Sequence, residues 1–181
     1  MHFNPSYIPG SFEITLSPRE DERGIFTRLF CLEEFSAIGH YKNIVQVNNS
    51  VNHRIGTIRG MHFQRPPHEE VKIIRCIKGR IFDVLVDVRK SSPTFLKWHA
   101  VELSASKNNM IYIPEGIAHG FQVLERDSEL LYFHTQYYHP ESEGALRYDD
   151  PLLGIKWPKK PVNVSDKDKS YRLINEEFTG L

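Results

Sequence analysis

Cysteine is scarce in this chain: Cys31 and Cys76 are the only two among 181 residues. Two thiols cannot form a framework of several disulfides, and these two lack the close spacing of a metal-binding motif. Free thiols are typical of proteins that stay in a reducing compartment. We therefore expect both cysteines to be buried or partly buried and the protein to be cytoplasmic.

An excess of one charge is also missing, because 23 Lys and Arg balance 23 Asp and Glu. Nucleic-acid-binding proteins normally carry a basic excess, so no nucleic-acid partner is expected. No apolar run approaches the roughly 20 residues of a membrane-spanning helix. The N-terminal MHFNPSYIPG lacks the basic and apolar regions of a signal peptide. The sequence therefore predicts a soluble protein with no membrane partner.

Internal repeats and low-complexity tracts are absent as well. The length fits one domain, at roughly 100–200 residues per domain, and a domain of this size buries about 70% of the surface that its unfolded chain exposes. Such a domain folds without disulfides or a structural metal. Glycine and proline, 11 of each, are scattered as single turn markers, which is typical of short strands joined by turns. We expect residues 1–181 to form one all-β domain.

The segment 80–88 is the clearest strand in the sequence. Its even-numbered positions, from Phe82 to Val88, are all apolar, whereas the alternate positions include Asp83 and Asp87. Successive side chains of a strand point to opposite faces of the sheet. We therefore predict that the wholly apolar face packs on the core.

Further strands and two short helices are expected around this segment. The expected strands are 12–16, 25–30, 44–49, 72–77, 97–103, 110–113, 120–125 and 129–137. Turns recur between them at short, fairly regular intervals, which favours a sandwich or barrel. One helix is expected at 32–38, ending before Gly39, and a second after Ser165. From about residue 150 the chain is expected to wrap irregularly over the barrel.

Several side chains could carry chemistry, although each has an ordinary structural alternative. His62 follows a flexible glycine and could face a cavity or be a partly exposed loop residue. Lys72 starts an apolar strand, where it could protect a sheet edge or stabilise a developing oxyanion. Tyr132 could be a core residue with a locally bonded hydroxyl. The segment from Ser165 to Asp168 reads, by itself, as a helix cap.

The segment IPEGIAHGF (113–121) contains the spacing Pro-x-Gly-x-x-His, which is the second half of the cupin signature. This half-motif makes the chain resemble the cupin superfamily. A cupin metal site also needs an H-x-H pair, but here His62 is followed two residues later by Gln64, and His68 lies beyond two prolines. Catalytic metals usually have three well-placed protein ligands. We therefore expect no metal.

Many segments in order resemble one family in particular, the dTDP-4-dehydrorhamnose 3,5-epimerases, over roughly residues 10–170. The segments are DERGIF (21–26), QVN (46–48), IRGMHFQ (58–64), KIIRC (72–76), GRIFDVLVDVR (79–89), SPTF (92–95), VELS (101–104), IPEGIAHGF (113–121), LY (131–132), YYHP (137–140), DPLLGIKWP (150–158) and SDKD (165–168). The resemblance implies a jelly-roll cupin that uses no cofactor and forms a homodimer with exchanged strands. It also implies a nucleotide-linked 4-keto-6-deoxyhexose as substrate, inverted at C3, at C5 or at both.

The chemistry of such an inversion explains why four residues would be needed. A C–H bond beside the C4 ketone is acidic because the resulting carbanion is an enolate. By resemblance, His62 is the base and Asp168 orients its imidazole. Lys72 would stabilise the enolate oxygen, and Tyr132 would return a proton from the opposite face. A phenol, with an ordinary pKa of about 10, holds its proton at neutral pH and so suits an acid.

The resemblance also implies a set of substrate-binding residues. Their positions match those that contact the sugar, the diphosphate or the nucleotide, the last in part from the partner subunit. Arginine suits a diphosphate because its planar fork offers bidentate bonds. The expected binding residues are Arg23, Phe26, Gln46, Asn48, Arg59, His119 and Tyr138.

The chain departs from the common pattern of the family in two places. Arg28 stands where many members carry Glu, which reverses a charge beside the expected nucleotide pocket and puts thymidine in question. The segment PPHEEVK (66–72) lacks the usual glycine before the lysine, so Glu69 or Glu70 could face the sugar. The alternatives are another cupin enzyme, such as a 3,4-ketoisomerase or a metal-dependent oxygenase, and a non-catalytic sugar-binding cupin.

Overall fold

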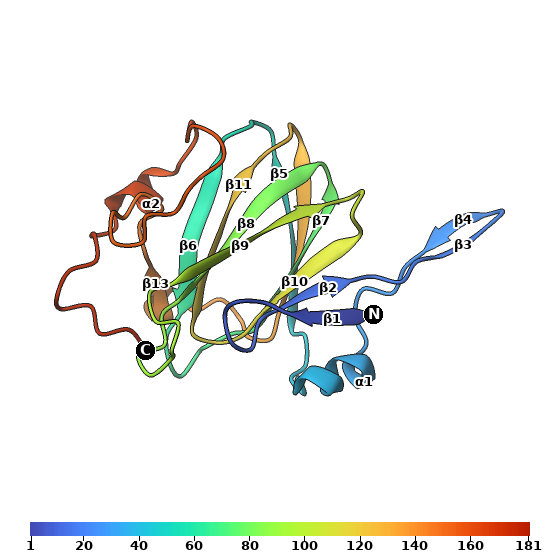
Figure 1. The fold of residues 1–181 in the computed structure, drawn as a ribbon, viewed down its shortest axis with the longest axis horizontal. Coiled ribbons are helices and arrows are strands. Elements are labelled where there is room, and N and C mark those ends of the chain that lie inside the picture. The colour runs from blue at the N-terminus through green and yellow to red at the C-terminus, as the bar shows by residue number, and fades with distance from the viewer.

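Two antiparallel sheets face each other in the computed structural model, which describes all 181 residues (Figure 1). The six-stranded sheet has the spatial order β1 (His2–Pro5), β2 (Phe12–Thr15), β10 (Asn109–Ile113), β7 (Lys72–Lys78), β12 (Ser128–His134), β5 (Gln46–Asn52). The five-stranded sheet has the order β13 (Glu143–Ala145), β6 (Ile58–Gln64), β11 (Ile117–Val123), β8 (Arg80–Asp87), β9 (Trp98–Ser104). Successive strands such as β6 and β7 lie in different sheets. This arrangement confirms the predicted all-β jelly roll.

β8 is covered on both of its faces. Its wholly apolar face packs on a core cluster closed by the C-terminal wrap, for example by Trp157. The prediction that this face packs on the core and the predicted wrap are therefore confirmed. The alternate positions are buried as well, because Ile81 and Leu85 pack between the sheets with Ile74 and Leu130. Alternation did not reveal this second buried face, since a strand covered on both sides carries no simple pattern.

Several strand boundaries also differ from those expected. β6 was not expected at all, since IRGMHFQ contains a glycine and lacks alternation. β11 begins at Ile117 rather than residue 120, and the strand expected at 25–30 ends at Phe26. That strand, β4 (Gly24–Phe26), pairs with β3 (Arg19–Asp21). Together they form a hairpin arm that projects away from both sheets (Figure 1).

The helices are short, as expected. α1 (Leu32–Phe35) continues as a 3₁₀ turn, η1 (Ser36–Ile38), and ends at Gly39, whose φ of 78° suits glycine. A second 3₁₀ turn, η2 (Pro140–Ser142), precedes β13. α2 (Asp166–Ser170) begins after Ser165, which caps it as predicted. No helix is long and apolar enough to cross a membrane.

The two cysteines remain free thiols. Cys76 lies in the core between the sheets, where burial raises its pKa to about 11. Cys31 is half-buried. Their predicted burial is therefore confirmed, and neither forms a disulfide.

Candidate active site

A cavity of about 570 Å³ opens between the two sheets. Its walls come from both sheets and from the segment that leads into α2. Most of the lining residues are polar or charged, which suits a hydrophilic ligand. The lining residues are Asn48, Asn49, Ser50, Thr57, Ile58, Arg59, His62, Lys72, His119, Phe121, Tyr132, His134, Asn163, Ser165, Lys167 and Asp168.

A bulge in β6 places two predicted residues in this cavity. Arg59 and His62 are three residues apart, so strict alternation would send them to opposite faces of the sheet. The pairing of β6 with β11 shifts register between them: His62 pairs with His119, but Arg59 pairs with Phe121. Gly60 lies at the shift with a φ of 126°, and a Cβ there would clash with the Gly120 backbone. The bulge therefore requires glycine and lets both side chains face one cavity.

His62 forms a close pair with Asp168. The His62 Nε2 atom lies 2.7 Å from Asp168 Oδ1, and the Gly60 amide donates to Asp168 Oδ2 at 3.4 Å. The Ser165 cap accepts the Asp168 amide at 3.0 Å and fixes the helix start that carries the carboxylate. Burial opposes the charged form of Asp168, yet its bond to His62 keeps the pKa below the ordinary 3.8. An ionised carboxylate thus orients the imidazole and leaves Nδ1 for the cavity.

Lys72 lies at the start of β7, in the opposite sheet, and is buried. Its ammonium donates to the His62 carbonyl oxygen at 3.3 Å and pairs with Glu70 Oε1 at 3.1 Å. Glu70 also accepts from His134 Nδ1 at 2.7 Å. Burial disfavours a charged Glu70, but Lys72 and His134 hold its pKa below the ordinary 4.5. Lys72 is therefore a fixed cation inside the cavity and not an edge-strand residue.

Tyr132 lies on β12, paired with Ile74 of β7, and packs partly against the core between the sheets. Its hydroxyl is 3.4 Å from Ser50 Oγ. Burial raises the pKa of Tyr132 far above the ordinary 10.0. The phenol therefore keeps its proton at neutral pH and faces the cavity from the sheet opposite His62.

His119 is held by a buried carboxylate, that of Asp83 on β8. Its Nε2 atom lies 2.8 Å from Asp83 Oδ2. Asp83 is completely buried, and burial raises its pKa although His119 favours its charged form. The second oxygen, Oδ1, has no hydrogen-bond partner. An aspartate alternating with apolar residues in a buried strand is the signal that could have identified this position.

The remaining predicted residues on the body of the protein lie in or beside the cavity. Arg59 Nε donates to Asn52 Oδ1 at 2.9 Å, and Asn48 lines the cavity. Gln46 and Tyr138 line a smaller hollow of about 200 Å³ that shares His62 and Lys72 with the main cavity. Glu70 lines it too, whereas Glu69 does not. Of the two glutamates that could face the sugar, only Glu70 is therefore placed to do so.

Arg23 and Phe26 lie on the projecting arm, away from this chain's own cavity (Figure 1). Arg23 pairs with Asp21 at 2.6 Å, and its side chain is 84% exposed. Phe26 is 73% exposed. Arg28, two residues after the end of the arm, pairs with Glu34 at 2.7 Å. The structure thus does not bring the arm residues together with the catalytic candidates within one chain.

Several neighbours of the site were not identified from the sequence. His134 contacts Glu70 and, at 3.4 Å, Asn48 Nδ2. Asn163 and Lys167 approach from the C-terminal segment. Lys167 lies within the segment SDKD, but that segment indicates only a helix cap. These contacts join positions far apart in the chain, so local patterns do not reveal them.

The arrangement combines groups suited to moving a proton. It offers an imidazole oriented by a carboxylate, a buried ammonium, and a protonated phenol in the facing sheet. The two histidines available for a cupin metal, His62 and His119, each bond a carboxylate of the chain through Nε2. Such a constellation can remove a proton from carbon, stabilise the resulting oxyanion and deliver a proton from the other side.

Comparisons with known proteins agree with this chemistry. The dTDP-4-dehydrorhamnose 3,5-epimerase of Salmonella typhimurium is 42% identical over 158 residues, covering 86% of each chain. A dTDP-4-dehydrorhamnose 3-epimerase of Streptomyces niveus is 36% identical over 177 residues, covering 97% of this chain and 85% of that one. A Legionella pneumophila 3,5-epimerase, solved in complex with dTDP-4-keto-L-rhamnose, has a TM-score of 0.90 and 37% identity, covering 95% of this chain and 92% of that one.

A model of one family, described as dTDP-4-dehydrorhamnose 3,5-epimerase, matches residues 5–176. That span includes every predicted catalytic and binding residue. Together with the solved structure, it confirms the cupin jelly roll and the resemblance on which the roles were based. The chain belongs to the dTDP-4-dehydrorhamnose 3,5-epimerase family.

Proposed function

We propose that the protein epimerises a dTDP-linked 4-keto-6-deoxyhexose at C3, at C5 or at both, within deoxysugar biosynthesis. Membership of the family makes it an isomerase, as predicted. The single observation that carries the mechanism is the placement of His62 and Tyr132 in facing sheets across one cavity. A sugar ring between the sheets presents one face to each residue, as inversion requires.

The reaction begins with removal of a proton from the carbon beside the ketone. His62 Nδ1 takes this proton because Nε2 is occupied by Asp168 at 2.7 Å. The imidazole becomes positively charged, and the ionised Asp168 stabilises that charge. This division of roles, with a base and an orienting carboxylate, is typical of general base catalysis.

The electron pair of the broken C–H bond moves onto the ketone oxygen, which becomes an enolate. Lys72 is the cation placed to stabilise it, since its ammonium is buried and fixed by Glu70 and the His62 carbonyl. A preorganised charge inside a cavity stabilises an oxyanion better than water does, because it does not have to reorient.

Tyr132 then donates its proton to the carbon from the opposite face. Its raised pKa keeps the phenol protonated until an acceptor as basic as an enolate carbon is present. The C4 ketone re-forms, and the configuration at that carbon is inverted. Solvent returns the phenol proton, and the imidazolium loses its proton before the next turnover.

The diphosphate and nucleotide would be held by cations at the cavity and by the arm. Arg59 and Lys167 line the cavity, and Arg59 offers the planar fork that suits phosphate oxygens. His119, Asn48, Gln46 and Tyr138 would contact the sugar from the positions described above.

A homodimer explains the exposed arm. Phe26 and Ile25 are 73% and 64% exposed on a hairpin with few contacts to the body, which is costly in an isolated chain. In a two-fold dimer the same arm reaches the other subunit from both sides. Arg23 and Phe26 would then complete the partner's nucleotide site.

Residues 1–181 would act as one domain, because the C-terminal wrap and β8 share one apolar cluster.

The test is to incubate the protein with dTDP-4-keto-6-deoxyglucose in deuterium oxide and follow the sugar by proton NMR. We expect deuterium at C3, C5 or both, with inversion at each labelled centre. Labelling at one centre alone would define a mono-epimerase. Lack of deuterium uptake by a folded protein that binds the nucleotide sugar would contradict the proposal.

A further inference from the structure

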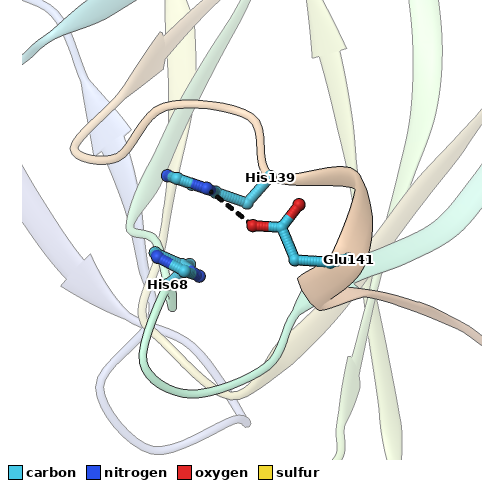
Figure 2. A group of neighbouring side chains, drawn as sticks. All are labelled: His68, His139 and Glu141. Atoms are coloured by element: carbon cyan, nitrogen blue, oxygen red, sulfur yellow. Dashed lines mark hydrogen bonds and ion pairs between the residues drawn. The ribbon is translucent and has the colours of Figure 1, made fainter.

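Two histidines and a glutamate meet outside the catalytic cavity, where two loops lie side by side (Figure 2). His68 comes from the loop between β6 and β7, whereas His139 and Glu141 come from the end of the β12–η2 loop and from η2. One nitrogen or oxygen atom from each residue lies within 4.8 Å of those of the other two. The two imidazoles are stacked, with ring centroids 3.6 Å apart and 10° between their planes.

A carboxylate lies beside the two stacked imidazoles, and neutral imidazole and carboxylate are forms that bind metal ions. Glu141 adds a negative charge beside them, with Oε1 3.0 Å from His139 Nδ1.

A hydrogen bond at Nδ1 fixes the orientation of the His68 ring. Its Nδ1 atom lies 2.8 Å from the hydroxyl of Ser142, which is buried. That bond leaves Nε2 without a partner in the chain. Metal-binding histidines typically have one ring nitrogen held by such a partner, which fixes both the ring and its tautomer.

The backbones that carry the two histidines are held by one buried side chain. The Gln64 amide donates to the His68 carbonyl at 2.9 Å and to the Tyr137 carbonyl at 3.1 Å. Its oxygen accepts the His139 amide at 2.7 Å. The two loops are thus preorganised by contacts that do not involve the imidazoles. A ligand bound by the imidazoles would not have to bring the loops together.

We propose that His68, His139 and Glu141 form a binding site for a divalent transition-metal ion of the zinc class. Two imidazoles and one carboxylate are ligands that suit zinc and its neighbours, whereas magnesium and calcium prefer oxygen ligands alone. Zinc bonds of about 2.0–2.1 Å in a tetrahedron place ligand atoms about 3.4 Å apart. The three ligand atoms, which lie within 4.8 Å of one another, would therefore have to draw together to about this distance. The two parallel rings cannot both direct a nitrogen lone pair at one ion, so the His139 ring must also rotate out of the stack. The side chains of His139 and Glu141 are 30% and 66% exposed, so both can move.

A metal ion bound here would connect two loops that also contribute to the active site. Glu70 and Tyr138, close in sequence to the two histidines, line the smaller hollow beside His62. A metal ion here would hold that wall in place without touching the reacting groups. Its role is therefore structural and separate from the epimerase chemistry.

The test is calorimetric titration of the chelator-treated full chain with zinc chloride. We expect one zinc ion per chain and a zinc-dependent rise in Tm. His68→Ala and His139→Ala should each weaken binding by at least tenfold, and Ser142→Ala by about tenfold through loss of the orienting bond. His53→Ala is the matched control, because His53 is an exposed histidine that also pairs with a carboxylate, Asp127. This control should bind zinc as the wild type does.

Two outcomes would overturn the proposal. One is zinc binding that survives in both folded alanine variants. The other is binding lost in His62→Asn instead, which would place the ion in the catalytic cavity. If an alanine variant does not fold, the absorption spectrum of bound Co²⁺ is compared between the wild type and Glu141→Gln, and this comparison tests the proposal instead. The proposal requires a tetrahedral-type absorption in the wild type that the substitution weakens, and an octahedral aqua-type spectrum in both contradicts it.

Discussion

Asp168→Asn is the sharpest single test of the catalytic pair. The substitution keeps the size of the side chain but removes the charge that lies 2.7 Å from His62 Nε2. Asp168 is 4% exposed, so water cannot replace the lost carboxylate. The asparagine amide can also donate to Nε2, which would place the ring proton on Nδ1 and block the base.

The magnitude follows from the charge that develops on His62. Opposite charges about 4 Å apart attract by roughly 4 kcal/mol at an effective dielectric constant of about 20. This energy corresponds to about a thousandfold in rate. Allowing for a residual dipole from asparagine, we expect kcat to fall by about 10²–10⁴, with KM much less affected because Asp168 orients His62 and does not hold the substrate.

The assay is proton NMR of substrate exchange in deuterium oxide, with thermal unfolding to show that each variant is folded. Asp166→Asn is the matched control, because it makes the same chemical change on α2 at a side chain that is fully exposed. We expect it to change stability by less than about 0.5 kcal/mol and to retain its activity. A kcat for Asp168→Asn within about threefold of the wild type would refute the assigned role.

Three further predictions concern the dimer and two buried charges. Mixing inactive Arg23→Ala chains with inactive His62→Asn chains should restore up to about one quarter of wild-type activity. Half of the dimers are then hybrids, and each hybrid has one intact site out of two. No recovery of activity in dimers shown to be hybrids would contradict a site shared between subunits. Glu70→Gln should cost about 3–5 kcal/mol in urea unfolding because it leaves buried Lys72 without its partner, whereas Glu69→Gln should change stability by less than about 0.5 kcal/mol; equal losses would contradict this. Burial disfavours a charged Asp87, but hydrogen bonds from Arg89, Ser92 and Thr94 hold its pKa below the ordinary 3.8. The charged carboxylate therefore stabilises the fold above pH 3.8, and this stabilisation is lost below it. The difference in unfolding free energy between the wild type and Asp87→Asn should shrink as the pH falls through 3.8, and a constant difference would contradict the assignment.

The fold was largely predictable because its strands are short, apolar and separated by turn residues. β7, β8, β9 and β10 lie close to where alternation and β-branched residues placed them. β6 could not be recognised in the same way. Its bulge at Gly60 breaks the alternation, and that irregularity is what brings Arg59 and His62 into one cavity. The bulge that brings both side chains into the cavity thus removes the alternation by which the strand could have been recognised.

The catalytic set was predicted through the family resemblance and not from local chemistry. Asp168 lies 106 positions after His62, and its own surroundings indicate only a helix cap. The burial of Asp83 was not predicted, because carboxylates are rarely fully buried unless they are paired. The stacked pair of His68 and His139 depends on two loops meeting, which no spacing along the chain reveals.

The central claim is that His62 and Tyr132 act on opposite faces of the sugar. The most direct measurement is the fate of the substrate with Tyr132→Phe in deuterium oxide, followed by NMR for both label and configuration. Without the phenol, His62 can still remove the proton and return deuterium to the same face. The account predicts deuterium uptake with retained configuration. Inversion at the wild-type rate would contradict it, because the second proton would then come from another residue.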